Sequence, residues 1–177
     1  MKIERTKAAE KPILKEVLRL LEEIENFPKK KKGDLSRQNV FGKQTVIEAF
    51  IMGKARSYSK KNLVPAAKNR KYPALYRALK KLMKTHNPDF KYNQIQINKN
   101  VKTAWHHDKG NKKMSYAIGL GNFTGGGIDI KIQEGNRKRI KNFDNKNRWL
   151  FYDGASNEHR TASFKGTRYA IIFYKHG

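Results

Sequence analysis

Two stretches in the first half of the chain repeat apolar residues at helical spacing. The first, residues 12–27, opens with a proline, which suits the first turn of a helix because proline lacks an amide hydrogen. Its apolar positions recur every three or four residues; they are Ile13, Val17, Leu20, Leu21 and Ile24. The pattern predicts an amphipathic helix that packs its apolar side across the back of a sheet.

A second helix is predicted over residues 73–85, and it too opens with a proline. Its inward positions are Leu75, Leu79, Leu82 and Met83, and its outward positions are Arg77, Lys80, Lys81 and Lys84. His86 follows at the end of this stretch. We interpret it as a helix-terminal cap rather than a metal ligand.

From Tyr92 onward the pattern changes to short runs typical of β-strands. The predicted strands are 92–98, 114–120, 127–132, 148–152 and 167–175. Between them, Gly125, Gly126 and Gly127 are interpreted as a hairpin turn, and not as a phosphate-binding loop, because no Gly-Lys-Ser/Thr sequence follows. Two helices followed by a run of strands indicate an α+β domain with the helices packed on one side.

Residues 34–71 carry no clear periodicity, because glycines and a proline interrupt the weak patterns there. A chain of 177 residues is long enough for one compact domain. We divide it into an N-terminal helix with a basic linker at 1–33, which includes the run Lys29 to Lys32, and a main domain at 34–177.

The composition excludes several classes of protein. There is no cysteine, which excludes disulfides, thiolate nucleophiles and the usual structural zinc sites. No run approaches the roughly 18 apolar residues that a membrane span needs, and the start, MKIERTKAAEK, lacks the apolar segment of a secretory signal. We therefore expect an intracellular protein, cytoplasmic or, in a eukaryotic host, nuclear, with no membrane partner.

The net charge of +25 is distributed unevenly along the chain. Residues 1–26 carry six basic and six acidic side chains, so the whole excess lies on residues 27–177. A folded domain with such an excess repels itself unless a polyanion is nearby, and a phosphate backbone is the commonest such partner. The charge therefore favours contact with nucleic acid over a general effect on solubility.

A metal site is indicated by the tripeptide His106-His107-Asp108. On an extended segment, side chains at positions i and i+2 point to the same side, so His106 and Asp108 share a face while His107 points away. His159, in a turn after a predicted strand, is the candidate third ligand. Two imidazoles and one carboxylate form the facial triad of non-haem iron(II) oxygenases, which leaves positions open for a co-substrate and oxygen. A zinc site, or a polar turn without a metal, would produce the same short pattern.

Arg168 lies nine residues after His159, at the start of an apolar strand. A buried arginine needs an anionic partner, or its burial costs several kcal/mol. The distal carboxylate of 2-oxoglutarate is such a partner, and a guanidinium can bind it through two parallel hydrogen bonds.

The alternation of residue types along the terminal strand indicates that one of its faces lines a hydrated pocket. One face carries Arg168, Ala170, Ile172, Tyr174 and His176, and the other carries Tyr169, Ile171 and Phe173. A face with a guanidinium, a phenol and an imidazole is poorly suited to an apolar core. It suits the lining of a site, although an edge strand with one solvated face would show the same alternation.

Together these segments resemble the TET/JBP family of DNA-base dioxygenases. The resemblance covers roughly residues 92–177, in four ordered pieces. They are WHHDKGN (105–111), SYAIGLGNFTGGGIDI (115–130), YDGASNEHR (152–160) and GTRYAIIFYKH (166–176). The resemblance implies a double-stranded β-helix, or jelly-roll, core and a chain similar to the minimal stand-alone members found in viruses, phages and protists.

The resemblance also implies roles for individual residues. His106, Asp108 and His159 would bind Fe(II), and Arg168 would bind 2-oxoglutarate, with O2 as the other co-substrate. Asn111 would hydrogen-bond a flipped base, Tyr174 would stack on it and His176 would contact its polar edge. A base modified at its 5-methyl group must indeed leave the duplex and be read in a pocket. The implied reaction is hydroxylation of 5-methylcytosine in DNA to 5-hydroxymethylcytosine.

The chain departs from the family pattern in two respects. The family usually has a hydroxyl residue two positions after the arginine, and here it is Ala170, so one hydrogen bond to 2-oxoglutarate is missing or comes from elsewhere. Without the cysteine-rich extension of animal TET enzymes, the chain must bind DNA otherwise, and we expect the basic segments 54–71 and 135–148 to do so. Further contacts to 2-oxoglutarate from Asn93 or Asn98 are left open.

Other functions remain open from the sequence. The same chemistry could act on thymine or a methylated RNA base, or the enzyme could be a prolyl or lysyl hydroxylase. A non-enzymatic basic nucleic-acid-binding module, whose histidines are incidental or bind zinc, is the alternative from another class. Trp105 and Trp149 are interpreted as packing residues near the mouth of the barrel.

Overall fold

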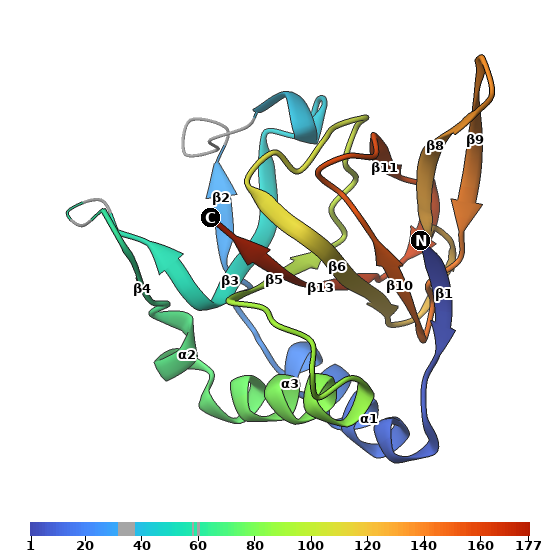
Figure 1. The fold of residues 1–177 in the computed structure, drawn as a ribbon. Coiled ribbons are helices and arrows are strands. Elements are labelled where there is room, and N and C mark those ends of the chain that lie inside the picture. Colours follow the sequence, from blue (N-terminus) through green and yellow to red (C-terminus); the bar gives the residue numbers. More distant parts are fainter. Residues whose placement is uncertain (32–37, 58, 60) are drawn as a thin grey trace.

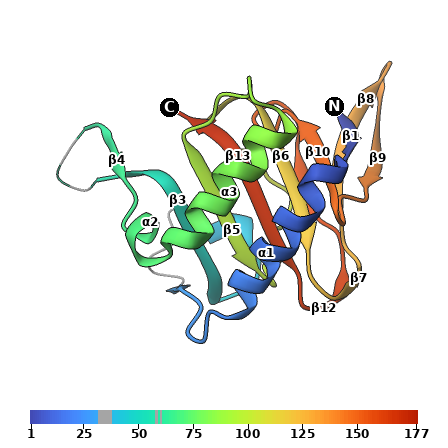
Figure 2. The ribbon, with the colours of Figure 1, turned by 90° about the horizontal axis from the view of Figure 1, so that it is seen from below.

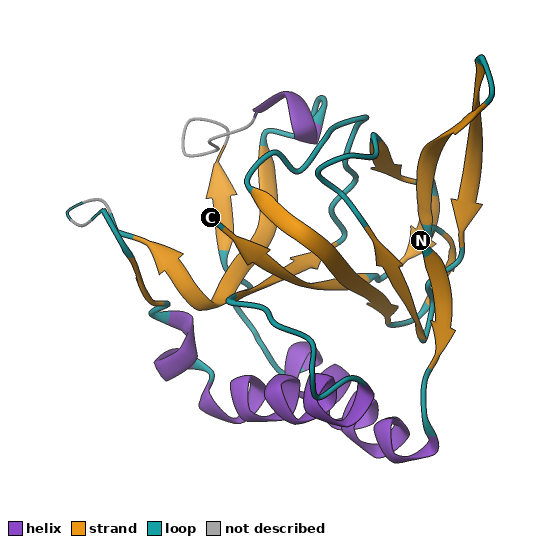
Figure 3. Ribbon diagram, in the orientation of Figure 1, coloured by secondary structure: helices purple, strands orange, loops and turns teal. Residues whose placement is uncertain are grey.

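The structure is a computed structural model that describes residues 1–31, 38–57, 59 and 61–177. These residues form an eight-stranded sheet, two small sheets of three and two strands, and a layer of helices (Figures 1 and 3). The large sheet has the strand order β1-β10-β6-β13-β5-β3-β2, with β4 paired to β3, and the small sheets are β11-β8-β9 and β12-β7. The expected α+β class with a jelly-roll core is confirmed.

The bounds of the elements are as follows. The helical segments are η1 (Ala8–Glu10), α1 (Lys11–Glu22), η3 (Gln38–Phe41), α2 (Lys68–Lys71) and α3 (Pro73–His86). The first strands are β1 (Lys2–Arg5), β2 (Lys29–Lys31), β3 (Val46–Arg56), β4 (Leu63–Pro65), β5 (Gln94–Lys99) and β6 (Asn111–Leu120). The later strands are β7 (Phe123–Gly125), β8 (Ile128–Glu134), β9 (Arg137–Phe143), β10 (Arg148–Tyr152), β11 (His159–Thr161), β12 (Phe164–Gly166) and β13 (Tyr169–His176).

Helices α1 and α3 lie side by side across one face of the large sheet (Figure 2). They bury the apolar positions that helical spacing singled out, among them Val17, Leu21, Leu79 and Leu82. Each of these side chains removes apolar surface from water, which contributes roughly 1.5–3 kcal/mol when burial is complete. Helix α1 is shorter than expected and ends at Glu22, because the chain then turns to bury Phe27 against the sheet.

The other face of the large sheet packs against the β11-β8-β9 sheet. Its apolar contacts are made by Ala117, Ile130, Leu150, Tyr152 and Ile172. Strand β13 therefore alternates as expected, since Tyr169, Ile171 and Phe173 lie in the helix-side core while Ile172 lies in the core between the sheets. The face of β13 that bears Ile172 therefore points between the two sheets, away from the helices.

A buried polar cluster fixes the amino terminus to the helix-side core. Glu10 is fully buried, and its carboxylate accepts hydrogen bonds from Trp149 Nε1 at 2.7 Å and from the amide of Lys7 at 2.6 Å. The Nδ1 atom of His86 lies 3.0 Å from the same carboxylate, and its Nε2 atom lies 3.1 Å from Glu4. Buried polar groups are tolerated when they are satisfied in this way.

Two expectations are corrected by this cluster. His86 is the last residue of α3, but its ring packs inward between two carboxylates instead of capping the helix. Trp149 is a packing residue, yet it is fully buried on the helix side of the sheet, far from any barrel mouth. Strand alternation alone does not say which face of β10 the helices cover.

Eight strands occur where none was expected; they are β1, β2, β3, β4, β7, β9, β11 and β12. Lys29–Lys31 of the supposed linker form β2, which pairs with β3, and residues 32 and 33 lie outside the described residues, as does the boundary between 33 and 34. Strands β1 and β9 are rich in charged residues, and β3 is buried on both faces. In all three strands, therefore, apolar and polar residues do not alternate clearly. These strands form because a neighbouring strand supplies the hydrogen-bond partners.

The three consecutive glycines are not a hairpin turn. Gly125 ends β7 and Gly127 precedes β8, and these two strands belong to different sheets, so the glycines carry the chain from one sheet to another. A Cβ atom on Gly127, which has a φ of +82°, would lie 2.6 Å from the carbonyl oxygen of Phe143. The passage is therefore too narrow for a larger residue.

Among the described residues, no helix combines the length and the apolar character needed to cross a membrane.

Candidate metal centre and its pocket

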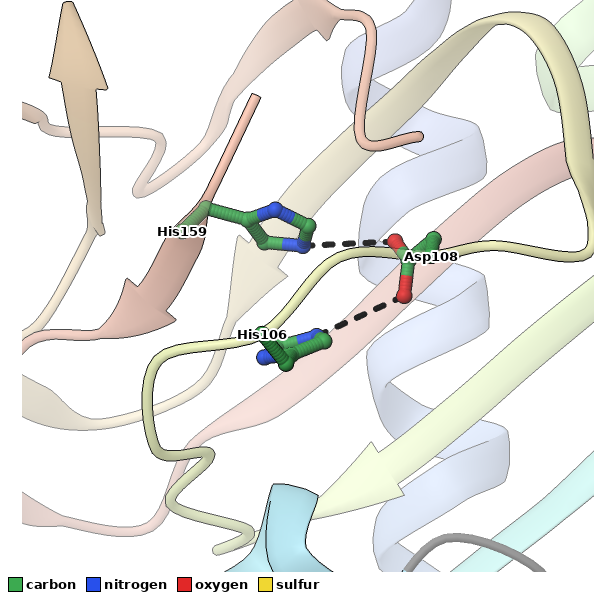
Figure 4. A group of neighbouring side chains, drawn as sticks. All are labelled: His106, Asp108 and His159. Atoms are coloured by element: carbon green, nitrogen blue, oxygen red, sulfur yellow. Dashed lines mark ion pairs between the residues drawn. The ribbon is translucent and has the colours of Figure 1, made fainter. Parts of the chain in front are cut away.

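The structure brings His106, Asp108 and His159 together, as the sequence pattern predicted. The Nε2 atom of His106 lies 3.4 Å from Oδ1 of Asp108, and the Nε2 atom of His159 lies 3.2 Å from Oδ2 (Figure 4). One ligand atom from each side chain lies within 4.8 Å of the other two, a spacing that can hold one metal ion. All three are at least partly buried.

The backbone explains why residues 53 positions apart meet. His106 and His159 form an antiparallel bridge in which each amide donates to the other carbonyl at 3.0 Å. Asp108 is fixed in turn by its amide, which donates to the carbonyl of Gly154 at 2.8 Å. A Cβ atom on Gly154 would lie 2.7 Å from Oδ2 of Asp108, so glycine leaves the room that the carboxylate occupies.

Each imidazole is oriented by its second ring nitrogen. Nδ1 of His106 lies 2.7 Å from the carbonyl oxygen of Ala104, and Nδ1 of His159 lies 2.8 Å from that of Asn157. Because a carbonyl only accepts, each Nδ1 donates, and in the neutral ring the lone pair then sits on Nε2. Both Nε2 atoms face the Asp108 carboxylate, so either a metal ion or protons on the two Nε2 atoms must lie between the rings and the carboxylate.

The pKa of Asp108 is consistent with a carboxylate that faces positive charge. Burial alone would raise the pKa of Asp108, but hydrogen bonds and positive charge from protonated His106 and His159 outweigh burial and hold that pKa far below its usual range. The carboxylate therefore stays ionised at neutral pH. His107 points away, with Nδ1 3.3 Å from the carbonyl oxygen of Ala155, as the alternation of an extended segment predicts.

Arg168 is a second charged group with a buried side chain and is only 4% exposed. Its Nε has no hydrogen-bond partner among the described residues, and no described carboxylate forms an ion pair with it. Burial lowers the pKa of Arg168 to about 10, so the guanidinium remains charged at neutral pH. Its surroundings are the rings of Phe123 and Phe164, whose centroids both lie 5.7 Å from Cζ.

This environment requires an anion. An unpaired buried charge costs several kcal/mol, and aromatic rings compensate only part of that cost. Gly119 and Gly126 lie beside the side chain, and a Cβ atom on either would be in van der Waals contact with Nε of Arg168, at 3.7 and 3.4 Å. The guanidinium therefore offers a binding site for an anion, and it shares with Asp108 of the triad an electrostatic influence on Tyr152.

The three residues that were predicted to contact a base gather beside Asp108. Asn111 and His176 are directly paired across β6 and β13, and the amide of Asn111 donates to the carbonyl of Asp108 at 2.9 Å. Burial raises the pKa of Tyr174, and the Asp108 carboxylate raises it further, which indicates that the phenol lies near the triad. Their contact with a base remains a prediction.

His176 joins this group to the basic hairpin formed by β3 and β4. Its ring packs over Gly110, where an added Cβ would lie 2.5 Å from Cε1. Burial lowers the pKa of His176, and the charge of Arg56 at the end of β3 lowers it further. Arg56 is thus within electrostatic reach of the predicted base-binding group.

Asn93, just before β5, and Asn98, within β5, have different surroundings. The side chain of Asn93 is bound to the backbone of His176: its Nδ2 donates to the carbonyl oxygen of His176, and its Oδ1 accepts from the amide of His176, both at 2.9 Å. Asn98 instead lies directly opposite Ala170 and accepts a hydrogen bond from Gln96 at 2.8 Å. Directly opposed residues share a sheet face, so Asn98 lies on the side of Arg168 and Ala170.

Trp105 packs against two basic side chains of the small sheet. The Nζ atom of Lys131 and the Cζ atom of Arg160 each lie 4.5 Å from the centre of its ring. The interpretation of Trp105 as a packing residue is consistent with these contacts, which lie on the outer surface of the small sheet.

Sequence reasoning missed Tyr152, the last residue of β10. Its ring centroid lies 5.3 Å from that of His159, in a T-shaped contact. The alternation of the predicted strand 148–152, with Leu150 and Tyr152 on one face, was the available signal. The residue was overlooked because a strand-end tyrosine carries no motif of its own.

The fold can be compared with solved structures. NgTET1 in complex with 5mC DNA matches with a TM-score of 0.54 at 12% identity, over 97% of this chain and 69% of that one. A 2OG-Fe(II) oxygenase family oxidoreductase from Burkholderia pseudomallei matches with 0.54 at 14%, over 91% and 77%. A prolyl hydroxylase from Trichoplax adhaerens, in complex with a hypoxia inducible factor peptide, matches with 0.58 at 14%, over 99% and 83%.

No protein-family model matches the sequence, and no curated protein matches it significantly. The likeness is therefore one of fold. The chain has the double-stranded β-helix fold of 2-oxoglutarate and iron(II) oxygenases, and its candidate metal triad lies between the two sheets of that fold.

Proposed function

We propose that the chain is an Fe(II)- and 2-oxoglutarate-dependent dioxygenase that hydroxylates the methyl group of 5-methylcytosine in DNA. The observation that carries the proposal is the presence of a two-histidine, one-carboxylate cluster and a buried, unpartnered guanidinium, with Asp108 of the cluster and Arg168 both within electrostatic reach of Tyr152. A metal at one end and a carboxylate at the other are the two anchors that a 2-oxo diacid needs.

The residues present fit the cofactors by their chemistry. His106, Asp108 and His159 would hold Fe(II), because two imidazoles and one carboxylate are the donor set of this class of iron site. Arg168 would hold the distal carboxylate of 2-oxoglutarate. When bound, iron and 2-oxoglutarate would supply oxygen activation, giving succinate and carbon dioxide while one oxygen atom is transferred to the substrate.

The protein's own contribution is binding and orientation. Phe123 and Phe164 exclude water around the guanidinium, which strengthens its hold on a carboxylate. Tyr174 would stack on a flipped cytosine, and the amide of Asn111 can both donate to and accept from its polar edge. The methyl carbon would thereby be held beside the triad.

DNA as the substrate is supported by the distribution of charge. The β8–β9 hairpin extends from the body with Arg137, Lys138, Arg139 and Lys141 all exposed. On the other side, Lys54, Arg56, Lys61, Arg70 and Lys71 are exposed on or near the β3–β4 hairpin, and Lys60 lies outside the described residues. Figure 1 shows the two hairpins on opposite sides of the strands, with the helices below. We propose that they hold the backbone of a duplex on either side of the site.

The chain is proposed to act as one domain. Strand β1 pairs with β10, and α1 packs into the main core, so residues 1–31 share the core of the remainder. This arrangement argues against an N-terminal segment that works independently.

Mass spectrometry of nucleosides tests the proposal directly. The protein is incubated with Fe(II), 2-oxoglutarate and ascorbate, and with separate duplexes that contain 5-methylcytosine or only unmodified thymine, a methylated RNA and a proline-containing peptide. We expect 5-hydroxymethylcytosine from the first substrate only, and no product with Asp108→Ala. Oxidation of thymine, RNA or peptide would replace the substrate assignment but keep the enzyme class.

The non-enzymatic alternative makes the opposite prediction. A basic nucleic-acid-binding module would bind DNA equally before and after His106→Ala and would never convert 2-oxoglutarate to succinate. Absence of succinate with every substrate, together with unchanged DNA binding, would overturn the enzyme proposal.

A further inference from the structure

The end of β13 carries two of the residues that were predicted to contact a base, and the sheet around it is irregular. The register between β13 and β6 shifts between Phe173 and Lys175, so that Tyr174 alone lies opposite three residues of β6. Such a shift interrupts the regular ladder of hydrogen bonds. Beyond it, β13 pairs with β6 only through its last two residues, Lys175 and His176.

On its other side, β13 loses its neighbouring strand at the same point. Strand β5 begins at Gln94, which lies opposite Tyr174. In that register the partner of His176 would be Tyr92, on the pocket side of the sheet. Tyr92 packs into the helix-side core instead, so the pairing ends before it reaches His176.

The side chain of Asn93 takes the place of the missing strand residue. Its Nδ2 donates to the carbonyl of His176 and its Oδ1 accepts from the amide of His176, the two bonds that a paired residue of an antiparallel strand exchanges with its partner. Asn93 is itself fixed by its backbone: its amide donates to the carbonyl of Tyr174 at 3.1 Å, and its carbonyl accepts from the amide of Lys54 at 2.8 Å. One asparagine thus joins β3 to the last residues of β13.

The position of the His176 ring follows from this backbone contact. The ring packs over Gly110, where an added Cβ atom would lie 2.5 Å from Cε1 and 2.7 Å from Nδ1. Gly110 comes two residues after Asp108, and its carbonyl accepts from the amide of Gly177 at 3.1 Å. His176 is therefore held between Asn93 on one side and, on the other, the loop that carries a candidate metal ligand.

We infer that Asn93 is a positioning residue for the predicted base-binding group: its side-chain amide holds the backbone of His176 and so sets where the imidazole meets a base. The inference rests on the proposed function. It gives Asn93 a part in reading the substrate and not in binding 2-oxoglutarate, because both polar atoms of its amide are bonded within the protein.

The ratio of 5-hydroxymethylcytosine to succinate tests the inference. Asn93→Ala removes both hydrogen bonds to His176 and changes no residue of the triad. We expect kcat/KM for methylated DNA to fall about tenfold or more, since a small displacement of a positioning group costs that much. The ratio should fall with it, because 2-oxoglutarate is then consumed without oxidation of the base. Asn93→Asp keeps the size and the acceptor but turns an oxygen toward the carbonyl of His176, and it should lower the ratio as well.

Nuclear magnetic resonance gives a second readout that needs no activity. In Asn93→Ala the amide of His176 loses its acceptor, so its hydrogen exchange should accelerate about tenfold or more. The Cε1–H signal of His176 should shift, while those of His106 and His159 should keep their positions. This pattern separates a local change at the end of β13 from a general loss of structure.

Asn87→Ala is the matched control. The side chain of Asn87 also makes one donor and one acceptor contact, to the hydroxyl of Tyr116 at 3.3 Å and from the amide of Asp89 at 3.2 Å, at the end of α3. Its loss should change neither the ratio nor the His176 signals. An unchanged ratio in Asn93→Ala, or an equal fall in Asn87→Ala, would overturn this inference alone. Absence of 5-hydroxymethylcytosine from the unmodified protein would overturn the proposed function and, with it, the part of Asn93 in reading a base.

Discussion

His106 and His159 are joined by two reciprocal backbone hydrogen bonds of 3.0 Å, so the metal site is built on a short antiparallel bridge and not on side-chain packing alone. The bridge orients both imidazoles toward Asp108 before any ion arrives. Such preorganisation lowers the cost of ordering ligands when a metal binds. It also means that one imidazole can be removed without dismantling the backbone that holds the other.

His159→Ala should therefore abolish metal-dependent chemistry while the fold persists. The backbone bridge to His106 remains, but the ion loses one of its three protein ligands. We expect affinity for Mn(II) to fall by more than about 100-fold, because even an outer partner of a metal ligand is worth 10–100-fold. Conversion of 2-oxoglutarate to succinate should be lost. Calorimetry and succinate detection measure the two effects, and retained turnover would show that another residue completes the triad.

Arg168→Met should stabilise the protein when no 2-oxoglutarate is present. The guanidinium is buried without an anionic partner among the described residues, so a similarly long apolar side chain removes an unfavourable charge. We expect a gain of about 1 kcal/mol, or about 2–4 °C in Tm. Added 2-oxoglutarate should raise the Tm of the unmodified protein but not that of the variant. A variant that melts lower in the absence of 2-oxoglutarate would contradict the account of an uncompensated charge.

The fold could be predicted from the sequence for elements that bury the same side along their whole length. Strand β10 spans the expected residues 148–152, and α3 begins at the expected Pro73, because each buries one side against a continuous core. Strand β9 could not be found, since Arg137–Phe143 exposes all but its last residue and is held by pairing with β8. Strand β3 was hidden by the opposite problem, burial on both faces.

The site was predictable to the same extent. Residues i and i+2 of an extended segment must share a side, so His106 and Asp108 follow from the local sequence. The meeting with His159 depends on tertiary pairing, so the local sequence could name His159 only as a candidate third ligand. The alternation of strand 148–152 gives the face of Tyr152 but not what lies opposite it, and the contact between Glu10 and His86 carries no local signature, because it depends on which face of a distant element lies opposite.

Glu10→Ala should be among the most destabilising single substitutions in the chain. It leaves the indole nitrogen of Trp149 without its 2.7 Å acceptor and leaves His86 facing an empty space in a fully buried setting. Removing one partner from a buried polar cluster costs about 3–5 kcal/mol. Urea denaturation measures the loss. Glu16→Ala, which removes a carboxylate from an exposed pair with Arg19, is the control and should leave the denaturation midpoint unchanged.

Neutralising the β8–β9 hairpin should weaken binding to DNA more than an equal change elsewhere. The variant replaces Arg137, Lys138, Arg139 and Lys141 with Gln. Each lost phosphate contact reduces the slope of log affinity against log salt by about 0.9, so we expect a shallower slope as well as weaker binding. Fluorescence anisotropy over a range of salt concentrations measures both.

The control for this experiment removes the same charge from the opposite layer. Arg77, Lys80, Lys81 and Lys84 are exposed on α3, on the helix side of the molecule. Their replacement with Gln should leave the salt slope nearly unchanged. Equal losses from both sets would mean that only net charge matters and that the hairpin makes no specific contact.

Tyr174→Ala should uncouple base oxidation from consumption of 2-oxoglutarate. The phenol ring is 9% exposed and lies near Asp108, where it would cover one face of a flipped base. Stacking of a base on an aromatic ring contributes about 1–3 kcal/mol, so kcat/KM for methylated DNA should fall about tenfold or more. Slow formation of succinate without DNA should continue, because the triad and Arg168 are intact. Tyr174→Phe keeps the ring and should retain most of the activity on DNA; if it loses as much as Tyr174→Ala, the hydroxyl and not the ring surface makes the contact.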